Sequence, residues 1–497
     1  MTPSQASRLP LEITFERAIP SWPLILFLLV LARLLATPMA LLNDPDTYLH
    51  IAAGRWMLAH AALPLHDPFS HSMPGAPWIC GEWLAEIVYA GVYGGFGWSG
   101  VVIVTALSVA LAVGVLLHFL LRRFEPLPAL IAAAAGAALL LPHALARPHA
   151  LALPLLVLWS GSLLAARDAD RPPPFRLLPA MVLWANLHGS FLFGLALAAF
   201  LGGEAVLWPG AGRSRRAEAG LWAAFVLLAL GAALLTPFGA EGLVQLVRLS
   251  QMPALQASFS EWLAPDFHHA AALELWLLGA LFVAFATGVR LPPARLLLLL
   301  GLVHMSLQHV RHADLLAIVG PLAVAAPLGR GLAALAGQHK PSGLTLWFAR
   351  LARPPRAPAV GVTLALAAAL ALPTALRPIV RPDDAVTPGA ALAAAQRLGL
   401  GGPVFNSEGF GGYLLFRGVP SFIDGRIEMY GNAFLARDNA AERGDEPALG
   451  EILSRYRIAW ALLSPDSGAA RDIALLPGWR LAYADPHALV YRRTAPP

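Results

Sequence analysis

The chain has 497 residues, of which 57% are hydrophobic and only 13% are charged. A soluble domain carries roughly 25% charged residues, so this composition excludes a single water-soluble core. The formal charge of +5 does not indicate nucleic-acid binding, because the basic residues lie in short connections between apolar runs. Cys80 is the only cysteine, which excludes an internal disulfide.

Apolar runs of nearly 20 residues recur along the first three quarters of the chain, and each could cross about 30 Å of hydrocarbon as a helix. The first run continues apolar past any cleavage site, so we interpret it as a retained helix rather than a signal peptide. The fifth and ninth runs are short enough to be broken or tilted. We predict about eleven spans, at 21–42, 99–121, 127–141, 149–166, 177–185, 190–208, 221–236, 271–288, 296–307, 315–328 and 357–376.

Lysine and arginine predict the orientation of these spans. Of the 22 basic residues before Arg377, 17 fall in alternate connections, and four fall in the opposite ones. The basic connections are therefore expected to be cytoplasmic, with a cytoplasmic N-terminus, as in a bacterial inner-membrane protein. The four exceptions are Arg55, Arg147, Arg248 and Arg311, and Arg33 lies inside the first run.

The composition changes near Arg377. Residues 377–497 hold 13 arginines and 13 acidic residues, against 22 basic and 17 acidic residues in the first 376. We predict an all-α polytopic membrane domain over 1–376, with a long outer loop at 43–98, and an extracytoplasmic α/β domain over 377–497. Strands are expected at 403–405, 421–424 and 458–463, and a hairpin from 480–483 and 488–491. Helices are expected after Gly412 and after Glu446.

Two aspartates open the first outer loop. Asp44 and Asp46 belong to the Asn-Asp-Pro-Asp sequence at 43–46, directly after the first apolar run. Carboxylates cost a few kcal/mol each if they enter hydrocarbon, so their retention at this boundary favours a function. Such a pair can hold a divalent metal or act as a base. The alternative is a polar helix stop with Asp44 as the N-cap.

An expected helix over 47–62 follows the aspartates. His50 lies four residues after Asp46 and would share its helix face, so the two could bind a metal together with Asp44 or hydrogen-bond each other. His50 could equally be an interfacial aromatic residue. Glu82 precedes Trp83 and an apolar helix, which makes it the best further candidate for substrate binding in this loop.

Arginines on the outer side oppose the positive-inside trend. Arg147 and Arg311 could bind a donor phosphate through bidentate hydrogen bonds, or they could pair with outer acids. Arg33 could contact a lipid phosphate or extend along the first helix towards water.

The remaining substrate-binding candidates are scattered along the chain. His188 lies at a break between two short apolar stretches, which a membrane tolerates only beside protein or a wet cavity. Glu261 lies in another outer connection. Asp424 and Arg426 lie at an expected strand end, where a structural pair would explain them equally well.

The chain resembles the multi-spanning glycosyltransferases of the GT-C fold, a superfamily that includes protein O-mannosyltransferases, the lipid A aminoarabinose transferase and oligosaccharyltransferases. The resemblance rests on the acidic motif at 43–46 in the first outer loop, the span count and a soluble domain after the last span. The segments 46–50, 184–189 and 422–426 resemble uncharacterised bacterial members. The segment 408–413 lacks the tryptophans and aspartate of the oligosaccharyltransferase Trp-Trp-Asp-Tyr-Gly element.

The resemblance implies transfer of a sugar from a polyprenyl-phosphate carrier to an extracytoplasmic acceptor, a lipid, glycan or protein, with inversion. It assigns Asp44 or Asp46 as the base or a metal ligand, and Arg147 and Arg311 as stabilisers of the leaving phosphate. Two other functions stay open. A transporter or flippase would favour charges deep in the membrane and repeated halves. A non-catalytic subunit of an envelope polysaccharide system could keep the same fold.

Overall fold

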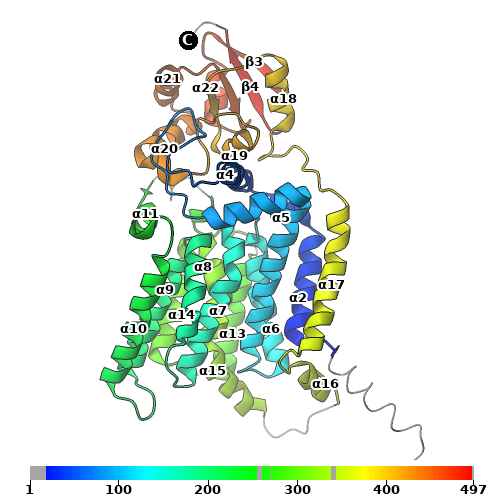
Figure 1. The fold of residues 1–497 in the computed structure, drawn as a ribbon, viewed down its shortest axis with the longest axis vertical. Coiled ribbons are helices and arrows are strands. Elements are labelled where there is room, and N and C mark those ends of the chain that lie inside the picture. Colours follow the sequence, from blue (N-terminus) through cyan, green and yellow to red (C-terminus); the bar gives the residue numbers. More distant parts are fainter. Residues whose placement is uncertain (1–17, 254–259, 270, 337–342, 495–497) are drawn as a thin grey trace, which may run out of the picture.

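The computed structural model describes residues 18–253, 260–269, 271–336 and 343–494 (Figure 1). Within these ranges, two sets of apolar helices form a bundle. Six are long and apolar enough to cross a membrane: α5 (Trp83–Leu120), α6 (Pro126–Leu140) with the turn η1 (Leu141–His143), α7 (Pro148–Asp168), α10 (Arg215–Ala233), the turn η4 (Val310–His312) with α15 (Ala313–Ala336), and α17 (Ala357–Leu376). Five are shorter: α2 (Trp22–Leu35), the turn η2 (Phe175–Leu177) with α8 (Leu178–Leu187), α9 (Phe191–Leu207), α13 (Ala272–Thr287) and α14 (Pro293–Gln308). The count of about eleven spans stays a prediction.

The first apolar run is not one helix. The prediction of a span over 21–42 was wrong, because α2 ends at Leu35 and a separate short helix, α3 (Pro38–Leu42), follows. The cause is Pro38, which disfavours helical backbone at the preceding residue. Thr37 accordingly has φ −128° and ψ 58°. The break shortens the first helix and turns the chain just before the two aspartates.

Two helices cross the end of the bundle beneath the C-terminal unit: α4 (Asp46–His60) and the first part of α5 (Figure 1). Helix α5 bends at Gly97, whose φ of 57° is a conformation that favours glycine. The part after the bend runs down the bundle, as expected for the second span. The helix predicted over 47–62 corresponds to α4.

Acidic and basic side chains also pair at the other end of the bundle. Arg295 contacts Asp168 at 3.0 Å and Glu204 at 3.2 Å, and Arg213 contacts Glu218 at 3.0 Å. The amphipathic helix α16 (Gly343–Leu351) lies at this end (Figure 1). Of the basic residues counted for orientation, Arg8, Arg17 and Lys340 lie outside the described ranges. The cytoplasmic assignment of this end stays a prediction.

After α17 the chain forms a unit with a four-stranded sheet of order β1-β2-β4-β3. Strands β1 and β2 pair in parallel, whereas β2–β4 and β4–β3 are antiparallel, so the expected hairpin is present. The strands of this unit are β1 (Val404–Asn406), β2 (Trp460–Leu463), β3 (Trp479–Ala484) and β4 (Leu489–Arg493). Its helices are α18 (Gly389–Arg397), α19 (Glu408–Phe416), α20 (Ile427–Arg443), α21 (Glu446–Arg455) and α22 (Gly468–Ile473). Helix α11 (Gly239–Ser250) precedes the unit and follows α10 in the chain.

The strand predicted at 421–424 is absent, although the segment is buried. Ser421 forms only an isolated parallel bridge with Ser70 of the outer loop, and the next residues bond to a side chain. The Asn406 Nδ2 donates to the Ile423 carbonyl at 2.9 Å, and the Phe422 N–H donates to Asn406 Oδ1 at 2.8 Å. The amide side chain thus takes the place of a ladder.

A buried ion-pair cluster joins the C-terminal unit to the first outer loop. The Arg426 guanidinium donates to Asp424 Oδ1 and Oδ2 at 2.7 and 2.8 Å, and to Asp67 Oδ1 at 2.5 Å. All three side chains are at most 2% exposed. The same guanidinium lies over the rings of Phe69 and Trp78. Because the cluster is closed to solvent, the substrate-binding prediction for Asp424 and Arg426 gives way to a structural one.

We expect Arg426→Met to destabilise the protein by about 3–5 kcal/mol, because it leaves Asp424 and Asp67 buried without a cation. Thermal unfolding in detergent measures this as a lowered Tm. Arg455→Met is the control, since Arg455 pairs with Glu451 on the surface and its loss should change Tm little. Equal effects of the two substitutions on Tm would contradict a stabilising role for the buried ion-pair cluster.

Candidate functional site

The aspartates are held by a turn between two helices. The backbone N–H of Ala146 donates to the Leu41 carbonyl at 2.7 Å, and Thr47 Oγ1 donates to the Ala146 carbonyl at 3.1 Å. The Tyr89 hydroxyl donates to the Arg147 carbonyl at 2.9 Å. These bonds place Arg147, the residue before α7, against the loop that carries the aspartates.

Arg147 is the centre of a charge network. Its Nε contacts Asp44 Oδ2, its Nη2 lies 3.2 Å from Asp46 Oδ2, and its Nη1 lies 2.7 Å from Glu261 Oε2. The other oxygen of Glu261 lies 3.2 Å from Arg311 Nη1. Five candidates from four distant outer segments therefore meet. For Arg147 the sequence left two possibilities open, phosphate binding and pairing with outer acids, and in the structure it pairs with acids.

The two aspartates differ in accessibility. Asp44 is 1% exposed, whereas the side chain of Asp46 is 25% exposed. Burial raises the pKa of Asp44 to about 6, against the opposing charge of Arg147. Asp44 Oδ1 also accepts the Asp46 backbone N–H at 2.7 Å. Asp44 therefore orients the loop and the guanidinium, and Asp46 is the carboxylate that a ligand can reach.

A second polar chain runs beside the first. His50 Nδ1 lies 3.1 Å from Glu86 Oε1, and its Nε2 lies 3.9 Å from Glu82 Oε2. The other oxygen of Glu82 lies 3.4 Å from His188 Nε2. Gly54 allows this approach of α4 to α5, because a Cβ there would lie 2.0 Å from the Glu86 carbonyl oxygen. The candidates His50, Glu82 and His188 are thus brought together, although they come from different elements.

Burial and neighbouring charge set the protonation of this chain. Burial opposes the charged form of His50, but the Glu86 hydrogen bond and the charge of Glu82 outweigh it and raise the His50 pKa to about 9. Burial raises the pKa of Glu82 to about 7. Burial also lowers the pKa of His188 well below its usual range. His50 therefore carries a positive charge at neutral pH, and His188 is neutral.

A divalent metal does not fit the described residues. Among them, no group of three His, Cys, Asp or Glu side chains is arranged to hold a metal ion. The Arg147 guanidinium already contacts Asp44 and Asp46, and His50 bonds to Glu86 instead. The proposed ligand set of Asp44, Asp46 and His50 is not assembled, so no step below uses a metal.

Some residues fell outside the sequence-based predictions, and one predicted residue lies away from the network. Arg33 is exposed and donates to Thr37 Oγ1 at 2.6 Å, apart from the other candidates. Asp314, which contacts His149 at 3.0 Å, was not chosen as a site residue. Glu86 was missed because it lies within an apolar helix. Its position four residues after Glu82 was the available signal.

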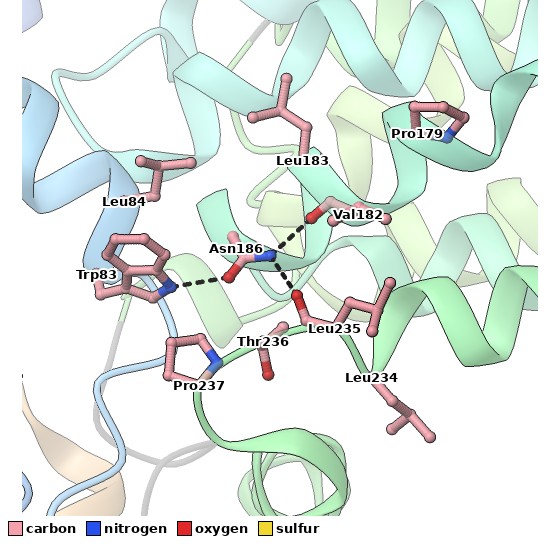
Figure 2. A pocket seen from close by; sticks show the side chains of 10 residues that line it. All are labelled: Trp83, Leu84, Pro179, Val182, Leu183, Asn186, Leu234, Leu235, Thr236 and Pro237. Carbon is pink, nitrogen blue, oxygen red and sulfur yellow. Dashed lines mark hydrogen bonds between the residues drawn. The ribbon is translucent and has the colours of Figure 1, made fainter.

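An apolar cavity of about 680 Å³ opens beside the second polar chain. Figure 2 shows Asn186, on α8, between Trp83 at the start of α5 and Leu235 after the end of α10. Trp83 Nε1 donates to Asn186 Oδ1 at 2.9 Å, and Asn186 Nδ2 donates to the Val182 and Leu235 carbonyls. Because its own polar groups are bonded internally, the cavity presents a largely apolar wall. Two of its lining residues are close in sequence to the second polar chain: Trp83 follows Glu82, and Asn186 lies two residues before His188.

No protein-family model matches the chain, and no curated protein sequence matches it significantly. Solved structures are similar in fold. An apo ArnT from Cupriavidus metallidurans is 15% identical, with 94% of this chain and 97% of that one covered and a TM-score of 0.48. An apo oligosaccharyltransferase from Archaeoglobus fulgidus is 14% identical, with 89% and 69% covered and a TM-score of 0.49. Both are members of the GT-C superfamily that the sequence resembles. With TM-scores below 0.5, these similarities transfer no activity or substrate to this chain.

The raised pKa of His50 predicts a pH-dependent stability. The group's contribution is fully present below its unfolded pKa of 6.5 and is lost as pH rises to about 9, and this shift corresponds to roughly 3 kcal/mol. We expect His50→Gln to lower Tm at pH 6.5, with the gap from wild type closing towards pH 9.5. His60→Gln, on the exposed end of the same helix, is the control and should show no such convergence. A constant gap would contradict the assignment.

Proposed function

We propose that the protein is a membrane glycosyltransferase that moves a sugar from a polyprenyl-phosphate carrier to a hydroxyl acceptor on the outer side of the membrane. The observation that carries the proposal is the meeting of Asp46, Arg147, Glu261 and Arg311 at the end of an apolar bundle. A reachable carboxylate beside guanidinium groups suits a reaction in which a hydroxyl is deprotonated and a phosphate leaves.

Asp46 is the base in this proposal. It accepts the proton of the acceptor hydroxyl as the new oxygen–carbon bond forms at the anomeric carbon, and the bond from that carbon to the phosphate oxygen breaks with its electron pair on the phosphate. Asp44 is buried and bonded to Arg147, so it is not free to attack the sugar. One displacement with one free carboxylate inverts the anomeric configuration. Asp44 is a positioning residue.

Arg311 is the better candidate for the leaving phosphate. Arg147 is engaged by three carboxylates, whereas Arg311 has one carboxylate contact and is 32% exposed. Its guanidinium lies over the Trp262 ring at 4.4 Å, which fixes its plane without occupying its N–H donors. A guanidinium held in this way can donate to phosphate oxygens as negative charge develops.

The apolar cavity supports a lipid-linked donor. Its wall includes Leu183 and Leu235, which are 45% and 65% exposed on the side of the bundle. The isoprene units of a lipid could pack against this wall from the hydrocarbon, and no polar backbone of the protein would have to be exposed. Trp83 and Asn186 of the lining are close in sequence to Glu82 and His188, which contact each other, so a bound lipid would have its apolar part in the cavity and its head group towards that pair.

We expect Asp46→Asn to abolish transfer, because the amide cannot accept the hydroxyl proton. The measurement mixes purified protein in detergent with radiolabelled polyprenyl-phosphate sugars and a membrane extract, and follows the label into an acceptor. Asp266→Asn is the matched control, since Asp266 is an exposed outer acid bonded to His268. Undiminished transfer by the Asp46 variant would overturn its role. No transfer by wild type from a broad donor panel would favour a transporter or a non-catalytic subunit.

Arg311→Gln should reduce the single-turnover rate by about 10²–10³-fold, the range seen when one oxyanion donor is removed. Arg311→Lys should recover part of the rate, because lysine keeps the charge and loses the fork geometry. Tm, measured alongside, should change little because Arg311 is partly exposed. A rate close to wild type in the glutamine variant would remove Arg311 from the phosphate site.

A further inference from the structure

The C-terminal unit contains a second cavity, of about 300 Å³, which the proposed reaction does not use. It lies where the parallel strands β1 and β2 end, between α19 and α20. Ser407 and Ser464 follow the two strands directly. In open α/β sheets, the crevice outside the carboxyl ends of parallel strands is where ligands bind.

The lining is acidic. Glu408, Asp438 and Glu442 contribute carboxyl groups, and none of the nine lining residues is basic. Asp438 and Glu442 are one turn apart on α20, where like charges destabilise a helix. Over the described part of the chain, no arginine, lysine or histidine forms a salt bridge with any of these three carboxyls. The cavity therefore gathers three carboxyl groups that no basic side chain pairs with, and burial raises the pKa of each of them.

Asp438 is a second and independent observation. Asp438 is only 3% exposed, and its Oδ1 has no hydrogen-bond partner among the described residues. The neighbouring donor is already used, because the Ser407 hydroxyl donates to Glu442 Oε1 at 2.8 Å. Buried polar atoms are almost always bonded, so an unpaired carboxylate oxygen facing a cavity indicates a missing donor. Burial and the charge of Glu442 raise the pKa of Asp438 well above its usual range, which favours the neutral acid, and a cation beside it would stabilise the carboxylate.

The form of the cavity limits what that donor is. The described residues offer no three-ligand metal arrangement, and 300 Å³ is about ten times the volume of a water molecule in the liquid. An ammonium group offers three N–H donors for carboxylates. Serine hydroxyls and the Asn439 amide on the same wall suit the hydroxyls of a ligand about the size of a monosaccharide.

We propose that this cavity binds a small polyhydroxylated organic cation through its ammonium group, which bonds to Asp438 and is surrounded by Glu408 and Glu442. The site does not depend on the transfer reaction, but it borders the Asp46 network, because the charges of Asp46 and Arg147 act on Glu408. The two lie close together, since α19 packs on the start of α4, where a Cβ on Gly412 would lie 2.4 Å from the Pro45 carbonyl oxygen. A bound cation would therefore be held beside the acidic loop.

Direct binding to the full-length protein in detergent tests this proposal without any donor lipid. Glucosamine and glucose are the probes, because they differ mainly in an ammonium in place of a hydroxyl. We expect glucosamine to bind at least ten times more tightly than glucose and to raise Tm, as a ligand specific for the folded state does. Asp438→Asn should remove this preference, and Glu442→Gln should weaken it. Glu451→Gln, an exposed acid on α21, should leave it unchanged.

The Asp438 variant is expected to fold, because it replaces an unpaired buried carboxylate by a neutral amide of the same shape. Its Tm without ligand should equal or exceed that of wild type. Equal binding of the two sugars, binding of neither, or a preference retained by Asp438→Asn would each overturn the site. Tighter binding of Mg²⁺ alone at the same residues would also overturn it. None of these results bears on transfer by Asp46, which the labelled-donor assay measures.

Discussion

The Arg147 guanidinium pairs with three carboxylates at the edge of the apolar bundle, and the arrangement around it depends on that pairing. Asp44 is almost completely buried, and an unpaired carboxylate there would be several kcal/mol too costly to keep. Arg147 can reach Asp44, Asp46 and Glu261 only because the turn before α7 is bonded to α3 and to Thr47. The backbone of that turn and the charges of the loop therefore stabilise each other.

The same solution recurs where the C-terminal unit meets the first outer loop. There Arg426 pairs with Asp424 and with Asp67, a residue 359 positions away, and holds the middle of the loop. Between the two guanidinium centres lies α4, with its apolar residues shared between the bundle and the C-terminal unit. The charged loop is thus fixed at its start and near its middle, which suits a base that has to be held in one position. Asp46 remains partly exposed within this frame.

The candidate site could be predicted in part because charge is rare in this sequence. Asp44, Asp46, Arg147 and Arg311 stood out as ionisable residues on the expected outer side, and they lie in one network. Arg426 was noted for a different reason, its place with Asp424 at an expected strand end, and the structure buries it against Asp424 and Asp67. A sequence pattern shows that a charged residue is present, but it does not show whether that residue pairs with a ligand or, like Arg426, with another side chain such as Asp67. Glu86 shows the converse, since an acid within an apolar helix has no local mark of its partner, His50.

The sequence by itself determined the apolar helices, the change of composition near Arg377, and most strands of the C-terminal unit, because these follow from local hydrophobicity and backbone preference. The break after Leu35 was also present in the sequence, as Pro38, although the prediction passed over it. Only the tertiary structure decided the side-chain bonding that replaces a strand at 421–424 and the separate roles of Asp44 and Asp46. Burial made that last distinction. Two aspartates two residues apart are chemically equal in sequence, and they differ only once distant segments cover one of them and leave the other within reach of solvent.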